Sequence, residues 1–267
     1  MRIRSNATDS RFRTWIATLE SRHLADLTFS EVSRSLRALS SAYVERRSTL
    51  AEGTALHGRG KRAAFALFYG PLHFLLVDHI VSALPPAREA SRLVDLGCGT
   101  GASGAAWAAA CVRPPTVVAI DRNAWALGEA AATYRGFGIT ARTRQEDVAH
   151  MRLPREPAAI LAAFTLNELP DAARDTLLDA LVARAAQPGG QLLIVEPLAG
   201  FVARWWNRWR DRIEAIGGRA DEWRIATELP AIVAKLDRAA GLDHREITGR
   251  SLFVASATRR AAPAASS

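Results

Sequence analysis

The sequence contains few cysteines for its length. Cys98 and Cys111 are the two cysteines in 267 residues, and no paired spacing joins them. Two such residues cannot build a disulfide framework, and they lack the spacing of a tetrahedral metal site. We therefore expect a protein of the reducing cytoplasm that binds no metal. No basic residue stands beside Cys98 in sequence to activate its thiol, so we expect a small packing residue and not a nucleophile.

Long hydrophobic runs are also scarce. The longest apolar stretch, residues 64–84, is interrupted by Pro71, His73, Asp78 and His79. These interruptions make it a poor membrane span and indicate a buried helix. The first six residues lack the apolar core of a signal peptide. Hydrophobic residues still make up 49% of the chain, which is enough for the core of one α/β domain with an elaboration.

Lysine is nearly absent, because arginine supplies 33 of the 35 basic residues. The formal net charge is +8, and the excess lies at the two ends of the chain. Basic residues outnumber acidic ones by 13 to 8 in residues 1–90 and by 12 to 8 in residues 200–267, against 10 to 11 in residues 91–199. Such a basic surface is typical of an enzyme that acts on RNA or docks to it. An arginine-rich base composition explains the same counts, so both interpretations stay open.

One glycine-rich segment carries most of the functional information. An apolar run ends at Val-Asp-Leu, with Asp95 as its acid, and alternate glycines follow at Gly97, Gly99 and Gly101. Alanine-rich, helix-forming sequence begins at residue 102. This pattern predicts a strand, a tight turn and a helix, with glycine where the backbone takes positive φ and approaches a ligand. We expect a nucleotide-like group to lie against the turn.

Two classes of nucleotide bind at such a turn. A dinucleotide site places a pyrophosphate on the helix N-terminus with the spacing G-x-G-x-x-G, which Gly99, Gly101 and Gly104 satisfy. Asp95 discriminates between the classes, because a carboxylate repels a pyrophosphate but suits the ammonium and sulfonium charges of S-adenosylmethionine. The segment therefore favours S-adenosylmethionine over NAD.

Residues 95–101 resemble motif I of the class I S-adenosylmethionine-dependent methyltransferases, and four later segments continue the resemblance. These are residues 117–121, 146–148, 158–164 and 189–197. The resemblance implies an α/β fold with a Rossmann-like, seven-stranded, mainly parallel sheet, to which this chain adds an N-terminal helical section. The cofactor-binding residues that it implies are Asp95, Gly97, Cys98, Gly99, Gly101, Asp121, Arg122, Asp147, Val148 and Phe164.

Two acidic residues have separate roles in this resemblance. Asp121 ends the second strand and would accept both ribose hydroxyls. Asp147 would accept from the adenine amino group, while the next backbone N–H, that of Val148, meets the ring. Each acid also has a purely structural interpretation, and Asp121 could simply cap the helix that begins near Ala124.

The chain divides into three predicted parts. Residues 1–90 form a helical section on the lid or substrate side, residues 91–258 form the S-adenosylmethionine-binding Rossmann-like domain, and residues 259–267 form a disordered tail. Within the first part, a helix opens at Phe29-Ser30 and runs through Leu39, and Tyr69-Gly70-Pro71 separates two further helices. Near the end, a helix over 229–240 precedes two short strands, around Glu246 and over 251–255.

The methyl acceptor is expected beside the end of the fourth strand. Asn167 and Glu168, which follow that strand, are weak catalytic candidates: Asn167 could hold a polar acceptor, and Glu168 could take its proton. Capping and surface roles explain both residues equally well. Tyr69 and His73 could cover the cofactor as a lid, or pack in the core. The Asn-Pro-Pro-Tyr signature of amino-methyltransferases is absent.

A tryptophan- and arginine-rich segment offers a second candidate substrate surface. Trp205, Trp206 and Trp209 alternate with arginines at positions 204, 208 and 210, a mixture that can stack on bases and contact phosphates. Trp205 and Trp209 share a helical face and could be core, whereas Trp206 would point elsewhere. The residues assigned to substrate here are Tyr69, His73, Trp206, Arg204 and Arg208. Alternatively, the same segment could cover a bound flat aromatic metabolite.

A second resemblance bears on the substrate. Residues 27–40, 64–76 and 164–169 resemble the methyltransferase-like family of the mitochondrial small ribosomal subunit and its bacterial relatives, over about residues 25–198. Mitochondrial members carry cysteines for an iron–sulfur cluster, which this chain lacks, so no cluster is expected. The leading hypothesis is a methyltransferase that acts on, or docks to, rRNA or the small ribosomal subunit. The alternatives are a small-molecule methyltransferase for a natural product or metabolite, and a non-catalytic, cofactor-binding ribosome assembly factor.

Overall fold

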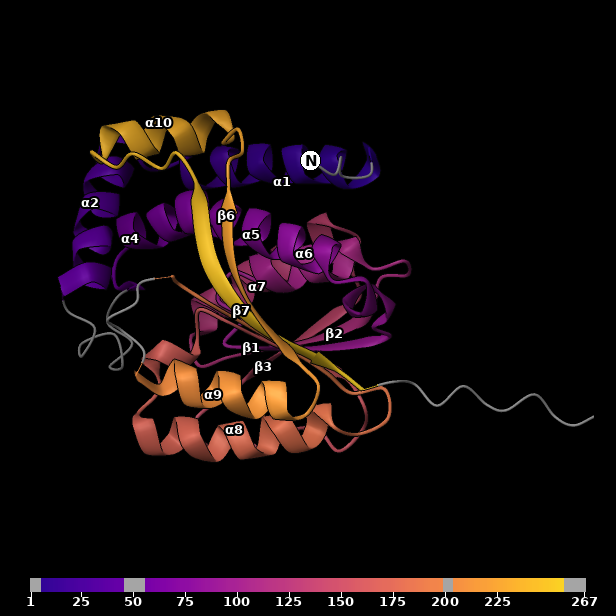
Figure 1. Ribbon diagram of the computed structural model, residues 1–267. Coiled ribbons are helices and arrows are strands. Elements are labelled where there is room, and N and C mark those ends of the chain that lie inside the picture. The colour runs from indigo at the N-terminus through magenta and orange to yellow at the C-terminus, as the bar shows by residue number, and fades with distance from the viewer. Residues whose placement is uncertain (1–5, 46–55, 199–203, 257–267) are drawn as a thin grey trace, which may run out of the picture.

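The computed structural model of the protein describes residues 6–45, 56–198 and 204–256, so the predicted tail at 259–267 lies outside the described residues. The described chain forms one seven-stranded sheet with helices on both faces (Figure 1). The strands are β1 (Arg92–Leu96), β2 (Thr116–Asp121), β3 (Ala141–Gln145), β4 (Ala159–Ala163), β5 (Gln191–Glu196), β6 (Arg219–Ile225) and β7 (Ile247–Ala255). Their order is β3-β2-β1-β4-β5-β7-β6, with β7 antiparallel to both of its neighbours. The predicted Rossmann-like fold is confirmed.

The helices separate into two layers. Before the sheet come α1 (Asn6–His23), α2 (Phe29–Glu45), α4 (Arg59–Ala64), the π-helix η2 (Phe65–Tyr69), α5 (Gly70–Ala83) and the 3-10 helix η3 (Pro85–Glu89). Between the strands come α6 (Ala102–Ala110), α7 (Ala124–Gly136), the 3-10 helix η4 (Leu166–Glu168), α8 (Asp171–Ala185), α9 (Arg204–Ala215) and α10 (Ala231–Ala239). In Figure 1, α8 and α9 lie on one side of the sheet, and the N-terminal helices lie with α6 and α7 on the other.

The central strands are buried on both faces, as expected for parallel strands covered by helices. In β1, Leu93 joins the cluster beneath the N-terminal helices, whereas Val94 joins the cluster beneath α8 and α9. Every residue of β4 and β5 is buried. The sheet therefore presents the carboxyl ends of β1, β2, β4 and β5 as its accessible functional edge.

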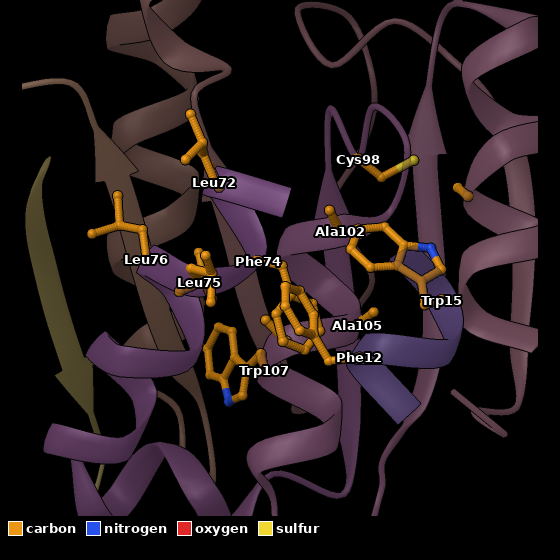
Figure 2. Packing of buried hydrophobic residues seen from close by; sticks show 14 of the residues in the cluster. Phe12, Trp15, Leu72, Phe74, Leu75, Leu76, Cys98, Ala102, Ala105 and Trp107 are labelled. Carbon is orange, nitrogen blue, oxygen red and sulfur yellow. The ribbon is translucent and has the colours of Figure 1, made fainter. Parts of the chain in front are cut away.

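The N-terminal helices share the hydrophobic core of the sheet domain. The rings of Phe12 in α1 and Phe74 in α5 stack with centroids 4.8 Å apart. Trp15 packs beside them, and its Nε1 donates to Thr133 Oγ1 of α7 at 3.2 Å. Figure 2 shows Phe12, Phe74 and Trp107 gathered in one cluster. This packing fixes α5 on the sheet and so positions the side chains that α5 directs toward the functional edge.

A capping box corrects the predicted start of the second helix. Thr28 Oγ1 accepts from the Glu31 backbone N–H at 3.3 Å, and Glu31 Oε2 accepts from the Thr28 N–H at 2.8 Å. Thr28 is therefore the N-cap, one residue before the predicted opening at Phe29-Ser30, because its hydroxyl and the Glu31 carboxylate satisfy two terminal donors reciprocally. The helix then runs to Glu45, beyond the predicted end at Leu39.

The predicted helix break at Tyr69-Gly70-Pro71 is wrong. The chain stays helical from Arg59 to Ala83, and the π-helix at 65–69 precedes Pro71. Proline lacks an N–H and its ring crowds the carbonyl four residues earlier, so a widened turn before it lets the helix continue. This helix is long and apolar enough to cross a membrane, but 78% of its most apolar window is buried inside the protein. It is a core helix, as the sequence predicted.

The C-terminal strands also differ from the prediction. One nine-residue strand, β7, replaces the two short strands expected near 246 and 251–255. Its edge partner β6, over Arg219–Ile225, was not predicted, because its charged residues give an edge strand little hydrophobic signal. The predicted helix over 229–240 is confirmed as α10, which begins after Pro230.

Candidate active site at the carboxyl ends of the parallel strands

A cavity of about 440 Å³ lies at the carboxyl ends of β1, β2, β4 and β5. It brings together twelve of the predicted site residues, from both the Rossmann-like domain and the helical section. They are Tyr69, His73, Asp95, Gly97, Cys98, Asp121, Arg122, Asp147, Val148, Phe164, Asn167 and Glu168. Of the other predicted residues, Gly99, Gly101, Trp206 and Arg208 do not line the cavity, and the side chain of Arg204 lies outside the described structure.

The glycine turn adopts the backbone that the sequence predicted. Gly97, Gly99 and Gly101 have φ values of 62°, 52° and 74°. A Cβ at Gly97 would overlap the Thr165 side chain, and a Cβ at Gly101 would lie 2.9 Å from Ala130 Cα. Those two glycines are thus required by packing as well as by φ, whereas Gly99 is required by φ alone.

The Asp121 carboxylate supports the glycine turn by hydrogen bonds to the backbone. One carboxylate oxygen accepts from the Gly99 N–H at 2.9 Å, and the other accepts from the Asn123 N–H at 2.8 Å. Burial raises the pKa of Asp121 above its ordinary value, while these two hydrogen bonds act in the opposite direction. Each oxygen keeps a further lone pair. Asp121 can therefore support the turn and accept from a ligand that lies in the cavity, so the structural and binding interpretations are compatible.

Asp95 has a structural role that the sequence did not indicate. Its side chain is 1% exposed, and the Tyr134 hydroxyl of α7 donates to its Oδ2 at 2.7 Å. A Cβ at Gly104 in α6 would overlap the same carboxylate. Burial raises the pKa of Asp95 to about 7. The carboxyl thus joins β1 to α6 and α7, and it also borders the cavity.

Asp147 and Val148 lie beyond the end of β3, at the outer part of the cavity. Asp147 Oδ1 accepts from the Ala149 N–H at 2.9 Å, so the side chain closes its own turn. Its side chain is 44% exposed, whereas Val148 is buried. Contact of these residues with an adenine ring stays a prediction. The alternative, that Asp147 has only a structural role, stays open as well.

Phe164 adopts a strained backbone at the end of β4. Its φ is +58°, the one positive value at a non-glycine residue in the described ranges. Its ring stacks on the His73 imidazole, with centroids 3.8 Å apart and planes 14° from parallel. Burial lowers the pKa of His73 to about 3, so this imidazole is neutral. Such strain persists where the surroundings impose it, commonly at functional sites, and here it positions a ring in the wall of the cavity.

Asn167 is organised by a buried carboxylate that the sequence analysis gave no role. Glu196, at the end of β5, is fully buried and accepts from the Leu166 N–H at 2.9 Å and from Asn167 Nδ2. Burial raises the pKa of Glu196 to about 8. Asn167 Oδ1 is buried and has no hydrogen-bond partner among the described residues. An acceptor atom left without a donor at the cavity wall is suited to a ligand donor.

Glu168 lies nearer to the cofactor side of the cavity. Its Oε2 is 4.0 Å from Arg122 Nη2, across the opening between η4 and β2. Surrounding protein atoms raise the pKa of Glu168 to about 7, although 38% of the side chain is exposed to the cavity and solvent. Arg122 partly offsets that increase. The position is compatible with both the predicted proton-accepting role and a structural ion pair.

The remaining wall is aromatic and comes from the long helix. Phe65, Tyr69 and His73 line the cavity one helical turn apart, with ring centroids about 6 Å apart. The π-helix places Phe65 and Tyr69 on this side together. Burial raises the pKa of Tyr69, which keeps its hydroxyl protonated. The predicted lid residues Tyr69 and His73 are thus part of a fixed wall of the cavity.

His244 also lines the cavity, and the sequence analysis missed it. Its Nδ1 lies 2.5 Å from Asp237 Oδ1, and its backbone N–H donates to Asp237 Oδ2 at 3.1 Å. Asp237 is in the last turn of α10, and His244 follows in the loop before β7. The spacing of seven residues across a helix end is no recognised motif, so no sequence signal pointed to this pair.

The tryptophan segment is part of the core. Trp205, Trp206 and Trp209 are 7%, 7% and 0% exposed and pack on the sheet face beneath α8 and α9. The Arg250 guanidinium lies 4.1 Å from the centroid of the Trp206 ring. The expectation that Trp206 points away from the core to stack on bases is therefore wrong: β7 supplies a partner for the second face of this helix.

Three arginines of α9 are engaged in ion pairs with acidic residues. Arg208 pairs with Asp175 of α8, and Arg212 pairs with Asp179 of α8 at 2.5 Å. Arg210 lies 2.9 Å from Asp211. Residues 201–203, and the side chain of Arg204, lie outside the described structure. These pairs neutralise much of the positive charge that the sequence assigned to an RNA surface.

Residues 93–190 match the model of a methyltransferase domain family. This part of the chain is similar to a methyltransferase domain. This match confirms the predicted methyltransferase, and the glycine turn, Asp121 and Asn167 all lie within it. No curated protein matches the sequence.

Solved structures support the fold of this methyltransferase. An O-methyltransferase family protein from Burkholderia thailandensis is similar with a TM-score of 0.55 and 16% identity, over 87% of this chain and 73% of that one. A SAM-dependent methyltransferase from Leishmania major gives 0.49 and 14%, over 90% of each chain. The plantazolicin methyltransferase BpumL, solved with SAH, gives 0.45 and 12%, over 85% and 97%. The first similarity supports the fold, and the other two scores are too low to carry an argument. The resemblance to the ribosomal-subunit family stays a prediction.

Proposed function

We propose that this protein uses S-adenosylmethionine to methylate a small, flat and largely apolar molecule. The observation that carries the proposal is the single cavity that joins the glycine turn and Asp121 to the aromatic wall of Phe65, Tyr69 and His73. Its volume of about 440 Å³ falls within the range of small-molecule sites. One cavity thus contains a nucleotide-binding end and an apolar end, which is what methyl transfer between two bound molecules requires.

The residues at the nucleotide-binding end of the cavity fit the cofactor. Asp121 offers two lone pairs to ribose hydroxyls, and Asp147 offers one acceptor to an adenine amino group. At Gly99 a Cβ would point toward Phe65 with contacts of 3.7 Å, so the glycine leaves space between the turn and the aromatic wall. When bound, S-adenosylmethionine would supply a methyl group on a cationic sulfonium.

The second end supports selection of a flat acceptor. The stacked pair of His73 and Phe164 and the ring of Phe65 present apolar faces, while Asn167 Oδ1 presents one hydrogen-bond acceptor. A site with mostly apolar walls and few polar groups orients a small molecule and excludes water. These residues would hold the acceptor in line with the methyl group and need not take part in bond making.

An RNA substrate is the competing proposal, and the net charge of +8 is its support. The buried tryptophans and the ion pairs of Arg208 and Arg212 weigh against α9 as an RNA-binding surface. A salt titration separates the two. If α9 binds RNA, the triple variant Arg204→Ala, Arg208→Ala and Arg210→Ala should show a slope of log affinity against log salt that is smaller by about three than the wild-type slope.

The direct test is incubation with tritium-labelled S-adenosylmethionine and a fractionated cell extract. We expect label in the fraction of small molecules that organic solvent extracts. Asp121→Ala should greatly reduce this labelling, and Asp179→Ala, a substitution on the surface of α8, should leave it unchanged. Label in RNA or in protein, with none in the extractable fraction, would overturn the proposed substrate class.

A further inference from the structure

The pair of His244 and Asp237 has the geometry of an oriented base. Both carboxylate oxygens of Asp237 are used, one by the imidazole Nδ1 at 2.5 Å and one by the His244 backbone N–H at 3.1 Å. Because a carboxylate accepts, this contact places the ring proton on Nδ1 and leaves Nε2 as the basic nitrogen. Among the described residues, none forms a hydrogen bond with Nε2. The side chain of Asp237 is 8% exposed, which fixes the orientation of the pair.

His244 is placed at the acceptor end of the cavity. It lines the same cavity as Tyr69 and His73, together with Ile247 and Thr248 at the start of β7. The ring of Phe68, which precedes Tyr69, meets the His244 ring edge to face with centroids 5.5 Å apart. Phe68 and Asp237 therefore restrain this imidazole from two sides, and 36% of its side chain stays exposed.

We propose that His244 is the general base that accepts the proton of a hydroxyl group on the methyl acceptor, with Asp237 as its positioning residue. This inference rests on the proposed function and names the acceptor atom as oxygen. The hydroxyl oxygen forms a bond to the methyl carbon, the carbon–sulfur bond breaks, and its electron pair passes to sulfur. The hydroxyl proton moves to Nε2 of His244, and the resulting imidazolium is stabilised by the Asp237 carboxylate.

The other titratable groups at this end are less suited to the role. His73 is stacked against Phe164, and its buried ring disfavours a positive charge. Glu196 is fully buried and accepts from Leu166 and Asn167, so its oxygens are occupied by protein donors. The Tyr69 hydroxyl is held protonated by burial. Asp95 and the turn residue Cys98 are buried, and Asp121, Arg122 and Asp147 lie at the cofactor end. Glu168 faces the Arg122 guanidinium at 4.0 Å, which favours an ion pair over proton transfer.

The first experiment tests the ring geometry and needs no acceptor. Nitrogen-15 NMR of the histidine rings in the full-length protein, at a pH high enough for the His244 ring to be neutral, should show the His244 proton on Nδ1. Asp237→Asn should change the proportion of the two tautomers, whereas His79→Asn, outside the cavity, should leave the His244 signals unchanged. A wild-type ring with its proton on Nε2 would overturn the proposal.

The second experiment tests the chemistry. Transfer of tritiated methyl to the solvent-extractable fraction should fall by about 100-fold or more in His244→Asn, the usual range for loss of a general base. The affinity for S-adenosylhomocysteine and the Tm should stay near wild type, and Asp237→Asn should lose less than His244→Asn. Added imidazole should restore part of the rate of His244→Ala, which the loss of a purely structural contact would not allow. Unchanged transfer in His244→Asn would overturn the base while leaving the methyltransferase proposal intact.

The labelled product gives the last test. Boron tribromide cleaves methyl ethers, and alkali hydrolyses methyl esters. Label that resists alkali and is released by boron tribromide supports a hydroxyl acceptor. Label that alkali releases, or that resists both treatments, indicates a carboxylate, nitrogen or carbon acceptor and overturns the inference. A wild-type protein that binds S-adenosylhomocysteine but labels only macromolecules overturns the proposed function as well.

Discussion

Asp121→Ala tests the cofactor end most directly, because this carboxylate combines a structural and a binding role. Under the proposed function its two oxygens accept from two ribose hydroxyls. Hydrogen bonds to a charged acceptor contribute about 1.5 to 3 kcal/mol each, but water replaces part of what is lost. We expect a net loss of about 2 to 3 kcal/mol, which raises the Kd for S-adenosylhomocysteine by roughly 30- to 160-fold.

The same substitution also removes acceptors from the Gly99 and Asn123 N–H groups, which lie 2.9 and 2.8 Å from the carboxylate. We therefore expect the free energy of unfolding to fall by about 1 to 3 kcal/mol. Titration calorimetry measures the first effect, and urea unfolding without ligand measures the second. Asp147→Ala is the comparison: a half-exposed side chain with one ligand contact should cost about 1 kcal/mol of affinity. If Asp121→Ala binds within threefold of wild type, Asp121 serves the turn alone.

Three further substitutions test the surrounding structure. The pKa of Asp95 is raised from 3.8 to about 7 by burial, so the folded state retains a proton that the unfolded state has lost. Stability should fall as pH rises from about 4 to 7. Asp95→Asn should remove about 2 to 3 kcal/mol of the fall that urea unfolding measures between pH 5 and pH 8; parallel pH profiles would contradict this. Gly101→Ala should lower the free energy of unfolding by more than about 2 kcal/mol, because the positive φ strains alanine and the new Cβ would overlap Ala130. Gly128→Ala, with open space around it, should not destabilise. Equal effects of the two substitutions would be inconsistent with the packed turn. Trp206→Ala should cost about 3 to 5 kcal/mol of stability and leave RNA retention unchanged; the opposite pattern would restore the RNA surface.

The cofactor end could be predicted because its information is local in sequence. Positive φ at Gly97, Gly99 and Gly101 is signalled by the glycines themselves, and the acid at the end of β2 follows at a fixed distance. The sequence could not show which neighbouring side chains exclude a Cβ at each of these glycines. Thr165, which a Cβ at Gly97 would overlap, is 68 residues away in sequence and reaches the turn because β4 pairs with β1.

The acceptor end was harder to predict because it is assembled from distant segments. Its walls come from the helix over 59–83, from η4, and from the loop that contains His244. The π-helix that places Phe65 and Tyr69 together has no signature beyond the following proline, which we interpreted as a break. For Trp206, helical periodicity assigned one buried face, and the structure buries a second face against Arg250 of β7. Hydrophobic periodicity along a helix does not show how many neighbouring elements will cover it.

The charge of the whole chain was also a poor guide to the charge of the site. The sequence carries a net charge of +8, yet Asp95, Asp121, Glu168 and Glu196 line the cavity. Arg122 lies near Asp121 and Glu168, and Arg250 lies near Glu196. Burial raises the pKa of all four carboxyl groups because their negative charges are poorly solvated. A bound cation would relieve that cost by stabilising the ionised forms, whereas a phosphate-rich ligand would increase it. The acidic cavity thus favours a sulfonium-bearing cofactor, and the basic exterior has no part in that selection.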